Sequence, residues 1–204
     1  PPIILVISGV ILALSVALAW RVRPAGEPFD GRLFWLGAAF MLVEVHNVSR
    51  LALVFGTTWQ VNAWVIGAIL VVILLANAAY AALRRQGWGV GRWAMVGLFA
   101  SLLAGWAIPL ETVLARGGGV AATFLMTLPL FFAGLVFAEA FSQTRSPGFA
   151  LGWNVLGSVV GGLAESLSYV LGIPALVPLA ALFYALALFW GRRPRTAVPV
   201  PAVA

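Results

Sequence analysis

The 204-residue chain contains no lysine and no cysteine, and it has one histidine, His46, and one aspartate, Asp30. Without lysine the chain cannot form the Schiff base that holds retinal or a similar carbonyl cofactor. Without cysteine it has no disulfide, thiolate metal site or cysteine nucleophile. One histidine excludes a bis-histidine haem and, beside a single aspartate, leaves no plausible Ser/His/Asp triad. We therefore expect no enzymatic activity and no bound cofactor.

Charged residues are also scarce, at 9%, whereas 63% of the residues are hydrophobic and the mean hydropathy is +1.06. Soluble domains are about 25% charged and about 45–50% apolar, so this surplus of apolar residues has to face lipid. The composition excludes a water-soluble protein. The net charge of +6 comes from twelve arginines scattered between apolar runs, which argues against a nucleic-acid-binding stripe.

Seven apolar runs are long enough to cross a hydrocarbon core of about 30 Å. They cover residues 3–20, 33–54, 61–80, 93–113, 120–141, 151–172 and 175–190. With seven crossings, ten arginines fall on one side of the membrane and only Arg116 on the other, as the positive-inside rule requires. The sequence thus predicts an all-α, polytopic bundle of seven transmembrane helices in residues 1–190, with the N-terminus outside, and a flexible cytoplasmic tail in residues 191–204.

Small and polar residues form a stripe along the predicted sixth span, at Asn154, Ser158, Gly161, Glu165 and Ser168. Their spacing of four, three, four and three residues places them on one helix face. Two readings of this stripe stay open. It is a helix packing seam, in which Gly157, Gly161 and Gly162 let a neighbouring backbone approach, or Glu165 lines a polar cavity and binds a cation or relays a proton.

The predicted second span carries Glu44, His46, Asn47 and Arg50. At 1.5 Å per residue, Arg50 lies about 25 Å into its span and Glu165 about 21 Å into the sixth. Because an unpaired intramembrane charge is costly, we expect these two side chains to approach one another, directly or through water. His46 is expected to be a hydrogen-bonded packing residue, with axial ligation of a pigment or metal as the alternative.

Three features near the ends of the spans predict local geometry. Glu111 and Glu139 are close enough to the span ends to be hydrated at the interface. Pro109 and Pro129 are expected to kink helices. The run of three glycines at residues 117–119 lacks the strand and the charged partner of a phosphate-binding loop, so it predicts a turn.

Residues 34–78, 128–141 and 154–176 resemble, in the same order, the membrane region of the bacterial spermidine-synthase-like multi-pass proteins. Glu44 and the motifs at 36–38, 55–59, 61–63 and 161–165 carry this resemblance. In that family a soluble aminopropyltransferase-like Rossmann domain accompanies the helices. No strand–GxGxG–helix unit occurs in these 204 residues, so the resemblance implies a membrane module without transferase activity.

The leading hypothesis is a non-enzymatic membrane subunit or membrane domain in the bacterial cytoplasmic membrane. Its partners would be the bilayer and either other membrane subunits or further copies of the chain. One alternative is a transporter for a small solute or cation, such as a polyamine, that uses Glu44 and Glu165. The other is a cofactor-holding subunit of an electron-transfer or photosynthetic complex, for which His46 is the candidate ligand.

Overall fold

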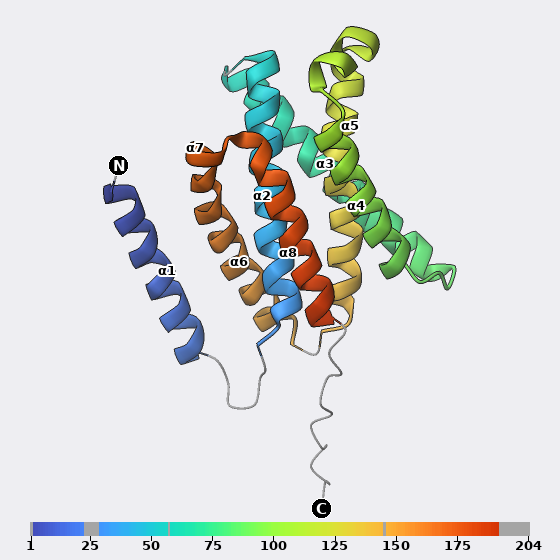
Figure 1. Cartoon of the computed structure of the whole chain (residues 1–204). Coiled ribbons are helices and arrows are strands. Elements are labelled where there is room, and N and C mark those ends of the chain that lie inside the picture. Colours follow the sequence, from blue (N-terminus) through green and yellow to red (C-terminus); the bar gives the residue numbers. More distant parts are fainter. Residues whose placement is uncertain (1, 23–28, 57, 145, 192–204) are drawn as a thin grey trace, which may run out of the picture.

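The computed structural model describes residues 2–22, 29–56, 58–144 and 146–191, and within them it contains helices and no strands (Figure 1). The long helices are α1 (Pro2–Val22), α2 (Gly31–Phe55), α3 (Trp59–Arg85), α4 (Gly91–Ala107), α5 (Leu110–Ser142), α6 (Pro147–Ala164) and α8 (Leu176–Gly191). Short elements join α6 to α8, namely η1 (Glu165–Leu167), α7 (Ser168–Leu171) and η2 (Ile173–Ala175). The predicted all-α class is confirmed.

Local chemistry accounts for several helix ends. The Asp30 carboxylate caps α2 by accepting a hydrogen bond from the Leu33 backbone N–H, at 3.1 Å. Pro147 occupies the first turn of α6, where its missing N–H costs nothing. Gly172, with φ +83°, ends α7 and starts the tight turn into α8, a conformation that side chains with a Cβ rarely adopt.

Five helical segments are long and apolar enough to cross a membrane: Gly31–Phe55, Asn62–Arg85, Gly118–Ser142, Pro147–Leu171 and Ile173–Gly191. A sixth results if the bent pair Gly91–Ala107 and Leu110–Arg116 counts as one span. Helix α1 is also apolar along its length of 21 residues. The chain is therefore a helical multi-pass membrane protein.

The predicted span over residues 93–113 needs correction, because it is not one straight helix. Pro109 has no N–H and its ring excludes the α conformation at the preceding residue, so Ile108 is extended, at φ −91° and ψ 116°. α4 ends at Ala107, and the next segment leaves at 86° to it. A second break follows at Gly118, whose φ of +70° fits the turn predicted for residues 117–119.

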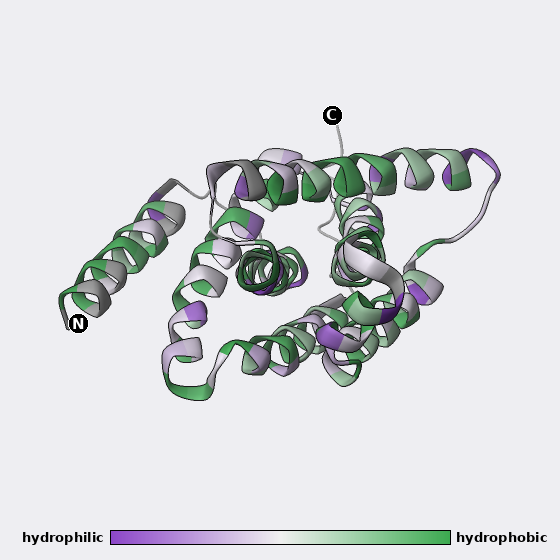
Figure 2. Ribbon diagram, turned by 90° about the horizontal axis from the view of Figure 1, so that it is seen from above, coloured by the Kyte–Doolittle hydropathy of each residue, from purple (hydrophilic) through white to green (hydrophobic). Residues whose placement is uncertain are grey.

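Helix α2 lies within the bundle and packs against α6, α8, α5 and α3 (Figure 1). Helix α1 stands to one side and contacts α6. Figure 2 shows hydrophobic residues along the outer faces of the helices, as lipid contact requires. The core beneath these faces is built mainly from leucine, alanine and valine side chains.

The arginine-rich helix ends gather at one end of the bundle. In Figure 1 the end of α1, the start of α2 and the end of α8 all lie at the lower end, as the alternating direction of the helices demands. Arg21 and Arg32 belong to this set, and Arg92 at the start of α4 lines one groove together with Arg32. Arg84 and Arg85 lie in the last turn of α3. The expectations at Arg23, at Arg145 and in residues 192–204 of the predicted tail lie outside the described residues.

Candidate functional site

The predicted packing glycines of α6 lie against the backbone of α2. A Cβ added to Gly157 would lie 1.9 Å from the Phe34 carbonyl oxygen, and one added to Gly161 would lie 2.3 Å from that of Ala38. Gly37 plays the same part on α2, since an added Cβ there would lie 2.0 Å from the backbone carbonyl oxygen of Asn154. The two backbones therefore approach as closely as glycine alone permits. Gly162 is less closely packed, since an added Cβ there would lie 3.9 Å from the Met41 Cε.

Two polar side chains of the same stripe tie α6 to α2. The Asn154 Nδ2 donates to the Leu33 carbonyl at 3.0 Å, and the Ser158 hydroxyl is 3.3 Å from the Gly37 carbonyl. A carbonyl oxygen has two lone pairs, so each can accept a side-chain donor besides its helical N–H. The part of the stripe from Asn154 to Gly161 is thus a helix packing seam.

The seam fixes the register of α6 against α2, and this register places the backbones of Arg50 and Glu165 at different heights, although the sequence predicted similar depths for them. Gly157 lies level with Phe34 and Gly161 with Ala38, an offset of 123 residues. The same offset brings Glu165 level with Leu42, so Arg50 lies eight residues, or about 12 Å, further along α2. Within the described residues no ion pair of 4.0 Å or less joins the two side chains.

Asn47 connects α2 to α5. Its side chain is 2% exposed, and its Nδ2 donates to the Met126 carbonyl at 2.6 Å. Pro129 lies three residues further along α5 and has no N–H, so the carbonyl of Leu125, next to Met126, lacks its helical donor. The Asn47 amide therefore supports the backbone of α5 where the proline weakens its own hydrogen bonding.

His46 lies on another face of α2 and is also buried, at 6% exposed. Its Nδ1 donates to the carbonyl oxygen of Ile173 at 3.3 Å, in the turn between α7 and α8. This contact holds the turn to α2 and matches the expected packing role. It leaves Nε2 as the ring atom with a lone pair, and metal-binding histidines often carry such a carbonyl contact at the other nitrogen.

The remaining predicted residues are less enclosed. Glu44, Glu165 and Ser168 are half-buried, and Ser168 begins the short helix α7. By the register of the seam, Glu44 and Glu165 differ in height by about 3 Å. Among the described residues no group of three or more His, Cys, Asp or Glu side chains could hold a metal ion.

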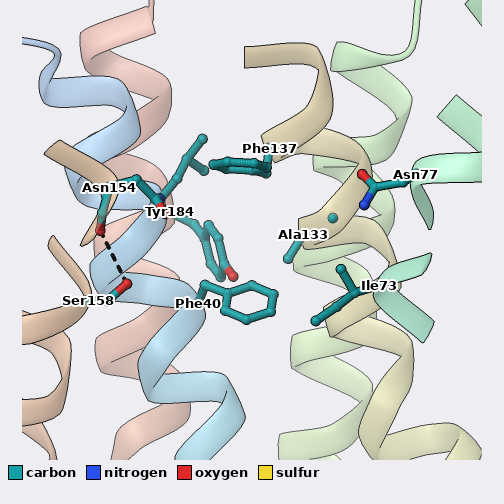
Figure 3. Close-up of a pocket in the computed structure, with 10 residues that line it drawn as sticks. Phe40, Ile73, Asn77, Ala133, Phe137, Asn154, Ser158 and Tyr184 are labelled. Atoms are coloured by element: carbon teal, nitrogen blue, oxygen red, sulfur yellow. Dashed lines mark hydrogen bonds between the residues drawn. The ribbon is translucent and has the colours of Figure 1, made fainter. Parts of the chain in front are cut away.

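A cavity of about 200 Å³ lies between α2, α3, α5, α6 and α8, and the predicted residues Asn154 and Ser158 belong to its lining. Tyr184 on α8 is fully buried, and its hydroxyl has no hydrogen-bond partner in the described residues. Figure 3 shows this hydroxyl directed into the space bordered by Phe40, Ala133 and Ile73. Asn77 of α3 lies at the far side of the same cavity. A lone tyrosine in an apolar helix gives no signal of this arrangement.

No family model, no curated protein and no solved structure matches this chain. The resemblance to the membrane region of the spermidine-synthase-like proteins therefore stays a prediction from the residues that carry it. The fold and the contacts described above are the basis for the function.

Proposed function

We propose that the chain is a non-enzymatic membrane subunit or membrane domain that packs against partner proteins inside the bilayer. It crosses the bacterial cytoplasmic membrane seven times, with α1 and the bent pair completing the count, and its N-terminus is outside. The family resemblance, which implies a membrane module, supports this proposal. So does the use that the helices make of their polar side chains.

Four of the eight polar residues singled out inside the spans bond within the bundle. Asn47, Asn154 and Ser158 contact backbone carbonyls of neighbouring helices, and His46 contacts the turn before α8. Groups engaged in this way stabilise the fold. This pattern favours a structural module over a transporter or an enzyme.

The outer face of α3 is the observation that carries the proposal. Ala63, Gly67, Leu70, Leu74, Asn77 and Ala81 follow one another at spacings of four and three residues, which is the pattern of a helix packing seam. Leu70 and Leu74 are more than 60% exposed, and a Cβ on Gly67 would meet nothing within 4 Å. The opposite face of α3 is the buried one, with Val65 and Ile69 in the core.

Asn77 gives this face a polar centre. It is exposed, and its amide makes no hydrogen bond within the described residues. Along the helix it lies about 10 Å from the arginine end of α3. An amide without a partner costs several kcal/mol in hydrocarbon. A partner helix with a side-chain amide or hydroxyl removes that cost, because an asparagine offers both donors and an acceptor.

Photo-crosslinking in native membranes tests the proposal. A photoreactive side chain at Leu74 is expected to give protein adducts, whose masses distinguish a second copy from another subunit. The same probe at Leu182, which is 54% exposed on α8, is the matched control and is expected to give fewer adducts. Asn77→Leu should weaken the adduct at position 74. Lipid adducts alone at both positions, with a stable monomer in mild detergent, would overturn the proposal.

The transport alternative has one observation in its favour, the similar height of Glu44 and Glu165 in the α2–α6 register. Against it, neither the cavity beside Tyr184 nor a second cavity along the outside of α4 has either glutamate in its lining. Uptake of a polyamine or cation into vesicles distinguishes the two functions. If the chain is a transporter, Glu165→Gln abolishes the uptake that the wild type shows. If it is a structural module, vesicles with the wild type and with Glu165→Gln show the same uptake as vesicles without the protein. For the cofactor alternative, an absorption spectrum of the purified protein shows whether His46 holds a pigment.

A further inference from the structure

A second groove, of about 690 Å³, runs along the outside of α4. Arg92 at the start of α4 and Glu139 near the end of α5 form its polar end, together with Arg32 and Gln143. Its wall consists of apolar side chains of α4. The groove therefore has a charged end and an apolar channel. No described residue of α3 lines it, so an inference from the groove is independent of the proposed function.

The polar end has two arginines, Arg32 and Arg92, and one carboxylate with an unpartnered oxygen. Gln143 bridges two charges, since its Oε1 accepts from the Arg32 Nη1 at 3.0 Å and its Nε2 donates to the Glu139 Oε1 at 2.7 Å. The other carboxylate oxygen, Glu139 Oε2, is buried and has no donor within the described residues. Arg92 is exposed and lines the same groove. A Cβ on Gly91, the residue before Arg92, would lie 3.6 Å from the Glu139 Cγ.

The apolar part of the groove has the length of one lipid leaflet. Met95, Val96, Phe99 and Leu103 line it, and Ala100 lies between them. From Arg92 to Leu103 the helix rises about 16 Å, at 1.5 Å per residue. Half of a hydrocarbon core is about 15 Å. An acyl chain that enters at the arginine end thus reaches the middle of the bilayer along α4.

We propose that this groove is a binding site for one phospholipid with a primary-amine headgroup, a phosphatidylethanolamine. The ammonium donates to Glu139 Oε2, the phosphate accepts from Arg92, and one acyl chain lies along Met95, Phe99 and Leu103. The positive end of the α4 helix dipole adds to the attraction for the phosphate. A phosphatidylcholine has no N–H to give to the carboxylate, and a phosphatidylglycerol places no cation there.

Native mass spectrometry of the delipidated full-length chain tests the site, with three lipids that share the same acyl chains. The wild type should bind phosphatidylethanolamine about tenfold more tightly than phosphatidylcholine or phosphatidylglycerol, the scale of one charge-assisted hydrogen bond. Glu139→Gln should bring the ethanolamine and choline lipids to equal affinity. Arg92→Gln should weaken all three lipids, because each carries a phosphate. Arg85→Gln, an exposed arginine at the end of α3, makes the same charge change outside the groove and should alter nothing.

Ala100→Trp gives a test that does not touch the charges. Ala100 is exposed on the groove, so a larger side chain there fills the channel without entering the core. It should lower the affinity for every phospholipid and leave the thermal stability of the protein unchanged. Equal affinity of the wild type for the ethanolamine and choline lipids overturns the proposal. So does a preference for phosphatidylglycerol, or unchanged binding to Ala100→Trp.

Discussion

Replacing Gly157 by alanine should separate α2 from α6, and the structure gives the size of the effect. The new Cβ would lie 1.9 Å from the Phe34 carbonyl oxygen, about 1.5 Å short of an ordinary contact at 3.4 Å. Overpacking of this kind costs about 1–3 kcal/mol. A shift that relieves the clash also stretches the hydrogen bond from Asn154 to the Leu33 carbonyl. An interhelical hydrogen bond in a membrane contributes about 0.6 kcal/mol, which is lost with it. We expect a loss of about 2–4 kcal/mol.

Reversible unfolding in mixed detergent micelles measures this loss, and Gly152→Ala is its control. Gly152 belongs to the same helix and an added Cβ there meets nothing within 4 Å. That substitution should be neutral or should stabilise the protein by up to about 1 kcal/mol, because alanine is the better helix former. Equal effects of the two substitutions would refute the close approach of α2 and α6.

Two further substitutions examine polar groups in the core. Asn47→Leu should cost about 1 kcal/mol in the same unfolding assay, because it removes the donor to the Met126 carbonyl; an unchanged midpoint would mean that this contact contributes nothing to stability. Tyr184→Phe should stabilise the protein by about 1–3 kcal/mol, because the buried hydroxyl loses no partner within the described residues. Destabilisation by Tyr184→Phe would instead show that a water or a ligand in the cavity bonds to that hydroxyl.

The helices themselves could be predicted from the sequence because the apolar runs are long and end at arginine, glycine or proline. A kink at Pro109 could be predicted from proline chemistry, although the apolar run continues through it and hydropathy does not change there. Proline chemistry accounts for the extended Ile108, but the 86° bend depends on how the segment Leu110–Arg116 packs. Tertiary contacts of this kind are not encoded in the local pattern.

The spacing of Asn154, Ser158 and Gly161 predicted a shared helix face, but it could not identify the neighbour or the register. The depth estimate for Arg50 and Glu165 assumed that both spans start at the same height. α6 begins at Pro147, earlier than the run predicted from residue 151, and the seam moves it along α2. Gly37 is the missed signal, because a glycine inside the second span marks the place where another backbone approaches.

The polar atoms that remain without partners differ in what each can accept, and this difference separates the kinds of occupant. The Asn77 amide offers donors and an acceptor on a lipid-facing helix surface, which suits a polar side chain of another protein. Glu139 Oε2 is an acceptor near the arginine end of the bundle, where cationic headgroups lie. The Tyr184 hydroxyl faces a cavity of about 200 Å³, which has room for several water molecules. Substitution of each residue should therefore alter a different property: association for Asn77, lipid selectivity for Glu139 and folding stability for Tyr184.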